Sequence, residues 1–151
     1  MKKKKIIIFG STGNTGSYLV EYLKNNLDSS LYEIVALSRN ATSFNKKQEG
    51  VIYLDVDITD KNTFGKIPSD NVYAVVNLAG AMPATMKERD FQKYIDVNIT
   101  GTLNVLEFCL KNKIDRLIYP TTEADLKGYW DKKLVLKPDL KRNYELSGNY
   151  A

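Results

Sequence analysis

The feature that most constrains this chain is a glycine-rich turn directly after a short apolar run. Residues 6–9 read Ile-Ile-Ile-Phe, and residues 10–16, Gly-Ser-Thr-Gly-Asn-Thr-Gly, place a glycine at every third position. Apolar residues at helical spacing follow from about residue 15. A buried strand that runs through such a turn into a helix is typical of the first unit of a β-α-β fold.

Each glycine of this turn has a separate physical role. Gly10 permits a sharp turn off the strand, Gly13 lets the backbone approach a pyrophosphate, and Gly16 lets the helix pack closely on the sheet. Unpaired N–H groups at the helix start would then face the phosphates of a dinucleotide. The predicted phosphate-binding residues are Gly10, Thr12, Gly13, Asn14, Thr15 and Gly16. The alternative is a plain connecting loop; the missing Gly-Lys-Ser/Thr ending argues against ATP or GTP.

Short apolar runs alternate with helical patterns along the first 120 residues. Strands are predicted at residues 6–9, 34–37, 51–54, 72–76 and 117–119. Their continuous apolar character is typical of strands covered on both faces. Helices are predicted at 15–26 and at about 90–111, the second capped by Asp90, and we expect helices between the other strands too. This alternation predicts an α/β fold with a Rossmann-like, doubly wound parallel sheet.

Composition excludes several classes of protein. The chain has 151 residues, which fits one domain, and no histidine, which excludes Ser-His-Asp catalysis and, with a single cysteine, the usual zinc sites. Cys109 has no partner for an internal disulfide, which favours a reducing compartment. The apolar run after the N-terminal lysines is too short for a signal peptide, so we expect a cytoplasmic protein without membrane spans.

Four lysines precede the first predicted strand and contribute to a net charge of +4. Such a run could contact nucleic acid or anionic lipid. Because the rest of the chain is near neutral and shows no basic stripe interleaved with aromatic residues, we interpret the lysines as a solvated lead-in to the strand. We therefore expect neither a nucleic-acid nor a membrane partner.

The glycine spacing resembles that of the extended short-chain dehydrogenase/reductases, the branch that contains the NAD-dependent epimerases and dehydratases. Four later segments resemble the same family in the same order. They are an adenine-contacting Asp-Ile pair, an Asn-x-Ala-Gly segment beside the cofactor, a long helix with an active-site Asn, and a fifth strand that normally ends in Ser-Ser or Ser-Thr. These segments are residues 57–58, 77–80, 97–106 and 117–122.

The resemblance implies roles near the cofactor or active site for six residues. They are Asp57, Ile58, Asn77, Ala79, Gly80 and Asn98. Other interpretations stay open. The carboxylates at residues 55, 57 and 60 could be solvated or could hold a metal, although they lie along an extended stretch and we expect no metal site. The first asparagine could simply cap a strand end, and the second could be an ordinary polar residue on a helix face.

The end of the second predicted strand bears on the choice of cofactor. An acidic residue there would accept the ribose hydroxyls of NAD, but residues 36–40 read Ala-Leu-Ser-Arg-Asn. Arg39 can instead pair with the 2′-phosphate of NADP and stack on the adenine, or it can point into solvent. We expect NADP as the cofactor, with NAD as the alternative.

The resemblance implies hydride transfer between a nicotinamide and a substrate carbon that bears a hydroxyl or carbonyl group. In the family a Ser or Thr orients that oxygen, a Tyr exchanges its proton, and a Lys four residues later lowers the Tyr pKa. Thr122, or its neighbour Thr121, occupies the hydroxyl position. Tyr129 and Lys133 have the correct mutual spacing but lie too soon after it, whereas Tyr150 lies at the family's distance.

Family members are about twice as long as this chain. We therefore expect residues 1–151 to form an NAD(P)-binding Rossmann domain at the N-terminal end of a longer protein, with an incomplete sheet, no C-terminal substrate lobe and no catalysis by itself. The longer protein would be an epimerase, dehydratase or reductase acting on a nucleotide-sugar, and the helix at 91–110 resembles the element that forms family dimers. The alternative is a non-catalytic, NADP-sensing regulator of the nitrogen-metabolite-repressor type.

Overall fold

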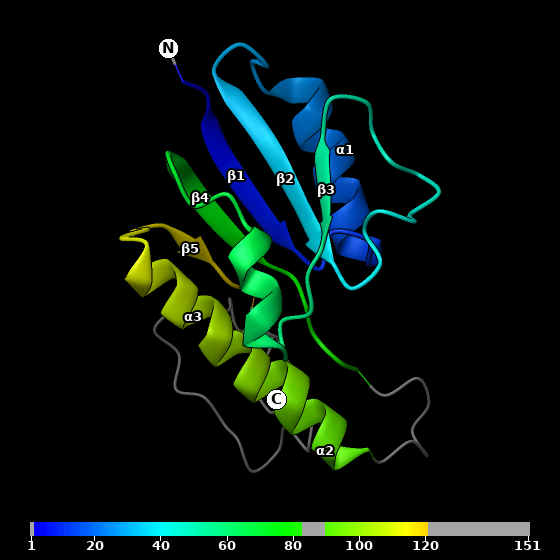
Figure 1. Ribbon diagram of the computed structural model, residues 1–151. Helices are drawn as coiled ribbons and strands as arrows, with labels where there is room; N and C mark the ends of the chain where they lie inside the picture. The colour runs from blue at the N-terminus through cyan, green and yellow to red at the C-terminus, as the bar shows by residue number, and fades with distance from the viewer. Residues whose placement is uncertain (1, 83–89, 121–151) are drawn as a thin grey trace, which may run out of the picture. The chain divides into compact units, whose positions relative to one another are not determined.

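The computed structural model describes residues 2–82 and 90–120, which form a parallel sheet flanked by helices (Figure 1). The strands are β1 (Lys4–Phe9), β2 (Tyr32–Ser38), β3 (Ile52–Asp55), β4 (Val72–Asn77) and β5 (Leu117–Ile118). Their order across the sheet is β3-β2-β1-β4-β5, and every neighbouring pair is parallel. The chain winds outward from β1 in both directions, which confirms the predicted doubly wound, Rossmann-like sheet.

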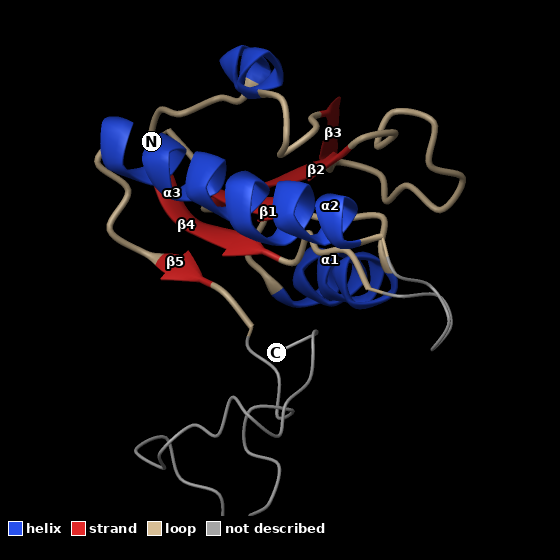
Figure 2. Ribbon diagram, turned by 90° about the horizontal axis from the view of Figure 1, so that it is seen from below, coloured by secondary structure: helices blue, strands red, loops and turns tan. Residues whose placement is uncertain are grey.

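Helices cover both faces of the sheet (Figure 2). One face packs against α1 (Asn14–Asn26). The other carries the 3₁₀ helix η1 (Lys61–Lys66) and a long helical run, which consists of α2 (Phe91–Tyr94), the π-helical segment η2 (Ile95–Gly101) and α3 (Thr102–Lys111). Asp90 caps this run as predicted, since its carboxylate accepts a hydrogen bond from the backbone N–H of Lys93 at 3.0 Å. Both predicted helices are thus confirmed, although the π-helical turns were not predicted.

Side-chain alternation along the central strands divides the core into two layers. Ile6 and Ile8 of β1 lie on the α1 side and pack with Val20. Phe9 points to the opposite side, where it packs edge-on against Phe108 of α3 with ring centroids 6.4 Å apart. Because successive residues of a strand point to opposite faces, a strand between two helical layers must be apolar throughout, as β1 is.

The connections on either side of β3 differ from the expectation of a helix in each. Residues 39–51 contain no helix, and the connection from β3 to β4 contains the six-residue η1. Between residues 39 and 50 only Ala41 and Phe44 are apolar, so a helix there could not bury a face. All four residues of β3 are only half-buried, because this strand lies at the edge of the sheet.

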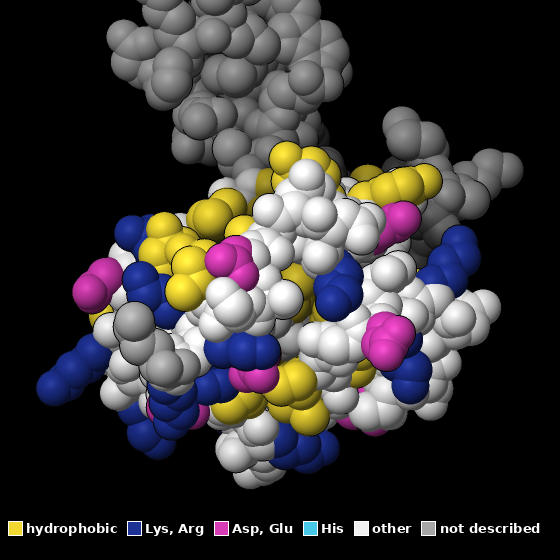
Figure 3. Space-filling model, turned by 90° about the horizontal axis from the view of Figure 1, so that it is seen from above, with side chains coloured by type: hydrophobic (Ala, Val, Ile, Leu, Met, Phe, Trp, Pro, Cys, Tyr) yellow, Lys and Arg dark blue, Asp and Glu magenta, His cyan; other side chains and the backbone are white. Residues whose placement is uncertain are grey.

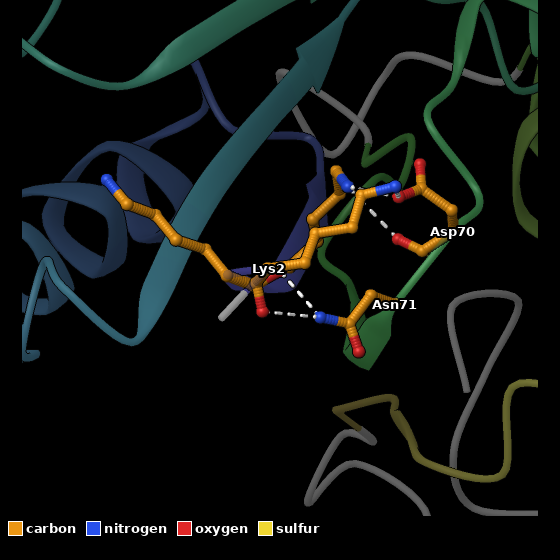
Figure 4. A network of polar contacts seen from close by, with 5 residues as sticks. Lys2, Asp70 and Asn71 are labelled. Atoms are coloured by element: carbon orange, nitrogen blue, oxygen red, sulfur yellow. Dashed lines mark hydrogen bonds and ion pairs between the residues drawn. The ribbon is translucent and has the colours of Figure 1, made fainter.

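The N-terminal lysines are more than the solvated lead-in that the sequence suggested. β1 begins at Lys4, and Lys5 is buried. The Nζ atom of Lys5 donates to the carboxylate and to the backbone carbonyl of Asp70, both at 3.0 Å, and Lys2 pairs with the same carboxylate (Figure 4). The side-chain amide of Asn71 donates to the carbonyl oxygen of Lys2 at 2.9 Å. At the end of the sheet where β1 begins, basic and acidic side chains are interspersed (Figure 3).

This network makes stability depend on pH. Hydrogen bonds from Lys2 and then Lys5 lower the pKa of Asp70 from 3.8 to about 2. Because the folded-state value is the lower one, the stabilisation is complete above about pH 4 and is lost as the pH falls through about 2. We expect Asp70→Asn to lower the melting temperature at pH 7, since it leaves the Lys5 ammonium buried without a carboxylate. The gap from the unchanged protein should narrow below pH 4 and nearly close at pH 2.

Melting curves from pH 2 to pH 7 test this expectation. Glu107→Gln is the matched control, because it breaks the exposed ion pair with Lys61, whose atoms lie 2.6 Å apart, and exposed pairs contribute little to stability. A gap for Asp70→Asn that is as wide at pH 2 as at pH 7 would contradict the role of this carboxylate.

Candidate functional site

A cleft of about 730 Å³ opens at the carboxyl ends of the strands. The turn after β1, the end of β2, the loops after β3 and β4, and the start of the long helical run all contribute to its wall. Predicted site residues that line it are Gly10, Thr12, Gly13, Arg39, Asp57, Ile58, Ala79 and Gly80. The strand order reverses direction between β1 and β4. Open α/β sheets bind ligands at this switch point, and the volume is within the usual range of ligand sites.

The glycine-rich turn closes tightly against its neighbours. Gly10 has a φ of +75°, a conformation that side chains disfavour, and a Cβ there would lie 2.6 Å from the backbone nitrogen of Ala79. A Cβ on Gly16 would lie 2.1 Å from the carbonyl oxygen of Gly10. At Gly13 the nearest atom, the same oxygen, is 3.3 Å away. Two of the glycines are therefore required by packing, while Gly13 is exposed at the cleft.

The first turn of α1 leaves its backbone donors available. Gly13 is the N-cap, no side chain accepts a hydrogen bond from the first turn, and the turn holds no acidic residue. Asn14 and Thr15 are exposed. Since the first N–H groups of a helix have no intrahelical acceptor and mark the positive end of its dipole, this turn is suited to a phosphate.

The end of β2 is joined to the glycine-rich turn by a hydroxyl pair that the sequence did not predict. The Thr12 hydroxyl donates to the Ser38 hydroxyl at 2.9 Å. The next residue, Arg39, is exposed and lines the cleft, and it makes no hydrogen bond or ion pair with a described residue. A cationic side chain and two hydroxyl groups thus lie where the sequence predicts the adenosine ribose.

Asp57 lines the cleft and uses one of its carboxylate oxygens within its own loop. Its Oδ1 accepts hydrogen bonds from the backbone N–H and the hydroxyl of Thr59, at 2.9 and 2.8 Å. Its backbone N–H donates to the hydroxyl of Thr63 at 3.1 Å. Within the described residues Oδ2 has no hydrogen-bond partner. That oxygen can accept a further donor, such as the amino group of an adenine.

The neighbouring carboxylates of this loop each have separate partners. Asp55 accepts from the hydroxyl of Thr42 at 2.6 Å, a hydrogen bond that lowers the pKa of that carboxyl. Asp60 accepts from the backbone N–H of Asn62 at 3.0 Å. Within residues 2–82 and 90–120, no group of three or more Asp, Glu or Cys side chains converges as a metal site would require.

Two asparagines shape the loop after β4. The Oδ1 atom of Asn77 accepts from the backbone N–H of Ala79 at 3.2 Å, so this buried side chain caps the strand end. Its Nδ2 is buried without a partner among the described residues. Asn98, from η2, pairs with both backbone groups of Ala81: its Oδ1 accepts from the N–H at 2.7 Å, and its Nδ2 donates to the carbonyl at 3.0 Å. The side-chain amides of Asn77 and Asn98 therefore position backbone segments that line the cleft.

The other predicted catalytic positions lie outside the described residues. They are Thr122 and Tyr150, together with the alternatives Thr121, Tyr129 and Lys133. Their roles stay predictions.

The remaining evidence comes from comparison with known protein families. Residues 6–126 match the NAD-dependent epimerase/dehydratase family. This chain belongs to that family. The match covers the glycine-rich turn, the loops around the cleft and the long helical run, so it confirms the resemblance drawn from the sequence motifs.

Three similar proteins each cover most of this chain, and the chain spans less than two fifths of the length of each of the three. UDP-glucose 4-epimerase from Pisum sativum is 26% identical over 129 residues, which are 79% of this chain and 37% of the relative. GDP-mannose 4,6-dehydratase from Vibrio cholerae is 32% identical over 121 residues, 70% of this chain and 31% of the relative. The structure of L-threonine dehydrogenase from Clostridium difficile superposes with a TM-score of 0.67 at 28% identity, covering 83% of this chain and 38% of that one.

No described helix combines the length and apolar character that a membrane span requires.

Proposed function

We propose that this chain is the dinucleotide-binding part of an NAD(P)-dependent epimerase, dehydratase or reductase that acts on a nucleotide-sugar. The observation that supports this most is the cleft itself, which lies at the switch point between β1 and β4 with the glycine-rich turn in its wall. The relatives named as acting on UDP-glucose and GDP-mannose support the class of substrate.

The residues of the cleft fit the successive parts of a dinucleotide. The uncapped first turn of α1 would receive the pyrophosphate, and the end of β2 with Arg39 would receive the adenosine ribose. The free oxygen of Asp57 and the side chain of Ile58 would contact the adenine. The loop from Asn77 to Gly80 would lie beside the nicotinamide. Such a cofactor supplies a carbon that accepts and returns a hydride.

The protein's own residues would orient the substrate and move the proton. The hydroxyl of Thr122 would hold the substrate oxygen, and Tyr150 would take or return its proton. A Tyr has an ordinary pKa near 10, so it needs a nearby cation to favour the phenolate at neutral pH. In this family, the Lys four residues after the Tyr supplies that charge.

Turnover by a longer protein that contains this chain tests the proposal. UDP-glucose, GDP-mannose and L-threonine would each be incubated with NAD or NADP, and the products followed by NMR. We expect conversion of a nucleotide-sugar, and we expect Thr122→Ala to slow it by a factor of about 100, the range for loss of one positioned hydrogen-bond donor to a reacting oxygen. Conversion of threonine alone would contradict the substrate class, and cofactor binding without any turnover would favour a regulator.

The choice between cofactors rests on Arg39. Its guanidinium can pair with the 2′-phosphate of NADP, and charge-assisted hydrogen bonds contribute about 1.5–3 kcal/mol. We expect NADP to bind at least about 10-fold more tightly than NAD, and Arg39→Ala to remove the difference. Calorimetric titration with both dinucleotides measures it, with Lys46→Ala as a control that removes an equal charge from the same loop. Equal affinities in the unchanged protein would contradict this role.

The long helical run also carries the proposed dimer contact. Large apolar side chains recur along it every three or four residues and are exposed, namely Phe91, Ile95, Ile99, Leu103, Leu106 and Leu110. A helix normally buries such a stripe, and contiguous exposed apolar surface marks interaction sites. A second copy of the chain is the partner that the family resemblance favours. Sedimentation of the unchanged protein and of Leu103→Asp tests whether a homodimer forms through this stripe.

A further inference from the structure

The loop that carries Ile58 is attached to the long helical run at two points one turn apart. The side chain of Ile58 is buried against the backbone of Gly101, where an added Cβ would lie 2.5 Å from its Cδ1 atom. The carbonyl oxygen of Ile58 accepts a hydrogen bond from Nδ2 of Asn104 at 2.7 Å. Asn104 is 5% exposed and lies 46 residues away in the sequence. Its side chain makes no other hydrogen bond among the described residues.

The 3₁₀ helix η1, which follows this loop, also contacts α3, through the exposed pair of Lys61 with Glu107 and the rings of Phe64 and Phe108. The hydrogen bonds within the loop itself have a different purpose. Thr63 and Thr59 bond with Asp57, and these three residues are close in sequence, so their hydrogen bonds fix the internal shape of the loop. They do not fix its distance from the opposite wall of the cleft. The hydrogen bond from Asn104 does fix this distance. It joins the loop to α3, which belongs to the helical run that also holds the opposite wall.

The same helical run holds the other wall of the cleft. Asn98, six positions before Asn104, pairs with both backbone groups of Ala81 in the loop after β4. One rigid element thus locates the loop after β3 and the loop after β4 relative to each other. A binding site requires its contacting groups to be held within about 0.5 Å of the productive geometry, so the separation of these walls matters for affinity.

We propose that Asn104 is a positioning residue for the Asp57–Ile58 loop. It holds this loop at the distance from the opposite wall of the cleft that is required to bind the adenine half of a dinucleotide. Asn104 does not itself line the cleft. It acts through Ile58, whose displacement would also carry the free Asp57 oxygen away from the adenine. The inference rests on the proposed function, since it requires that the cleft bind a dinucleotide with its adenine at this loop.

The test compares ligands that carry the two halves of the cofactor separately. ADP-ribose contains the adenine, and nicotinamide mononucleotide does not. Ligand-observed NMR gives dissociation constants for both, even when binding is weak, in the chain or in a longer protein that contains it. We expect Asn104→Ala to weaken ADP-ribose at least about 10-fold, which corresponds to about 1.4 kcal/mol, and to leave nicotinamide mononucleotide unchanged.

Gly101→Ala provides a second, independent variant. Alanine is favourable within a helix, and the three atoms nearest to its Cβ all belong to the side chain of Ile58. Gly101→Ala would push the loop away from the helix by crowding Ile58, whereas Asn104→Ala would remove the hydrogen bond that holds the loop there. Both changes displace the loop, so we expect the same selective loss of ADP-ribose affinity. It decides the question if Asn104→Ala fails to fold.

Val105→Ala is the matched control for a purely structural effect. Val105 is fully buried on the same helix, belongs to the hydrophobic core on that side of the sheet, and has no polar side-chain group that could bond to the cleft loops. We expect this variant to lower the melting temperature and to leave the ratio of the two affinities unchanged. If Asn104→Ala and Gly101→Ala also leave the ratio unchanged, the positioning role is wrong. If the unchanged protein binds neither ligand, the proposed function itself fails.

Discussion

Gly13→Val is expected to abolish dinucleotide binding while leaving the fold intact. Gly13 is exposed at the cleft and precedes the uncapped first turn of α1. A valine there would place two methyl groups where a pyrophosphate must approach the backbone N–H groups. Loss of two hydrogen bonds to a charged group, each worth about 1.5–3 kcal/mol, weakens binding by a factor of about 100 or more.

The fold should tolerate this change because the nearest atom to the new Cβ, the carbonyl oxygen of Gly10, is 3.3 Å away. A shift of a few tenths of an ångström accommodates it. The measurements are a calorimetric titration with NADP and a thermal melt of the same variant. Gly65→Val is the control, since a Cβ there meets no atom within 4 Å. Retained binding in Gly13→Val would mean that the dinucleotide lies elsewhere.

The elements that could be predicted from the sequence are those whose local residue pattern is compatible with only one kind of secondary structure. A continuous apolar run such as β1 requires cover on both faces, and helical spacing at residues 15–26 requires a helix. The prediction was wrong where it extended the β-α-β pattern beyond the residues that support it. Residues 39–51 contain no apolar stripe, and the expected helix there is missing.

Lys5 illustrates a different reason for a wrong prediction. A lysine in a run of lysines is usually solvated, and nothing nearby in the sequence indicates otherwise. Its partner, Asp70, is 65 residues away and comes next to it only because β1 and β4 are adjacent in the sheet. Whether the Lys5 ammonium is buried therefore depends on the order of strands in the sheet, which the run of lysines by itself does not indicate.

The same distinction separates the predicted and the unpredicted parts of the cleft. The glycine-rich turn was predictable because its three glycines act on each other within seven residues. The contacts Thr12–Ser38, Asn98–Ala81 and Asn104–Ile58 join residues 26, 17 and 46 positions apart. Polar side chains at strand ends and inside a long apolar helix indicated that such residues make hydrogen bonds. A single sequence does not show which residue is the partner of which. The walls of the cleft are thus held by long-range bonds around a locally encoded turn.

Gly16→Ala is expected to destabilise the protein strongly. The new Cβ would lie 2.1 Å from the carbonyl oxygen of Gly10 and 2.8 Å from the Cα of Ser11. Both are backbone atoms and cannot rotate away. Overpacking a rigid site costs about 1–3 kcal/mol and sometimes more, against a total stability of about 5–15 kcal/mol.

Helix propensity acts in the opposite direction, since alanine is about 1 kcal/mol more favourable than glycine inside a helix. Any measured net loss would therefore mean that the steric cost outweighs this gain, and a net loss of about 2 kcal/mol would mean a steric cost of about 3 kcal/mol. Urea unfolding measures it as a lower midpoint at an unchanged slope, which separates a change in stability from a change in the unfolded state. Gly65→Ala makes the same substitution in open space and should shift the midpoint little. If the two variants unfold at the same urea concentration, the close contact between α1 and the turn does not hold the fold together.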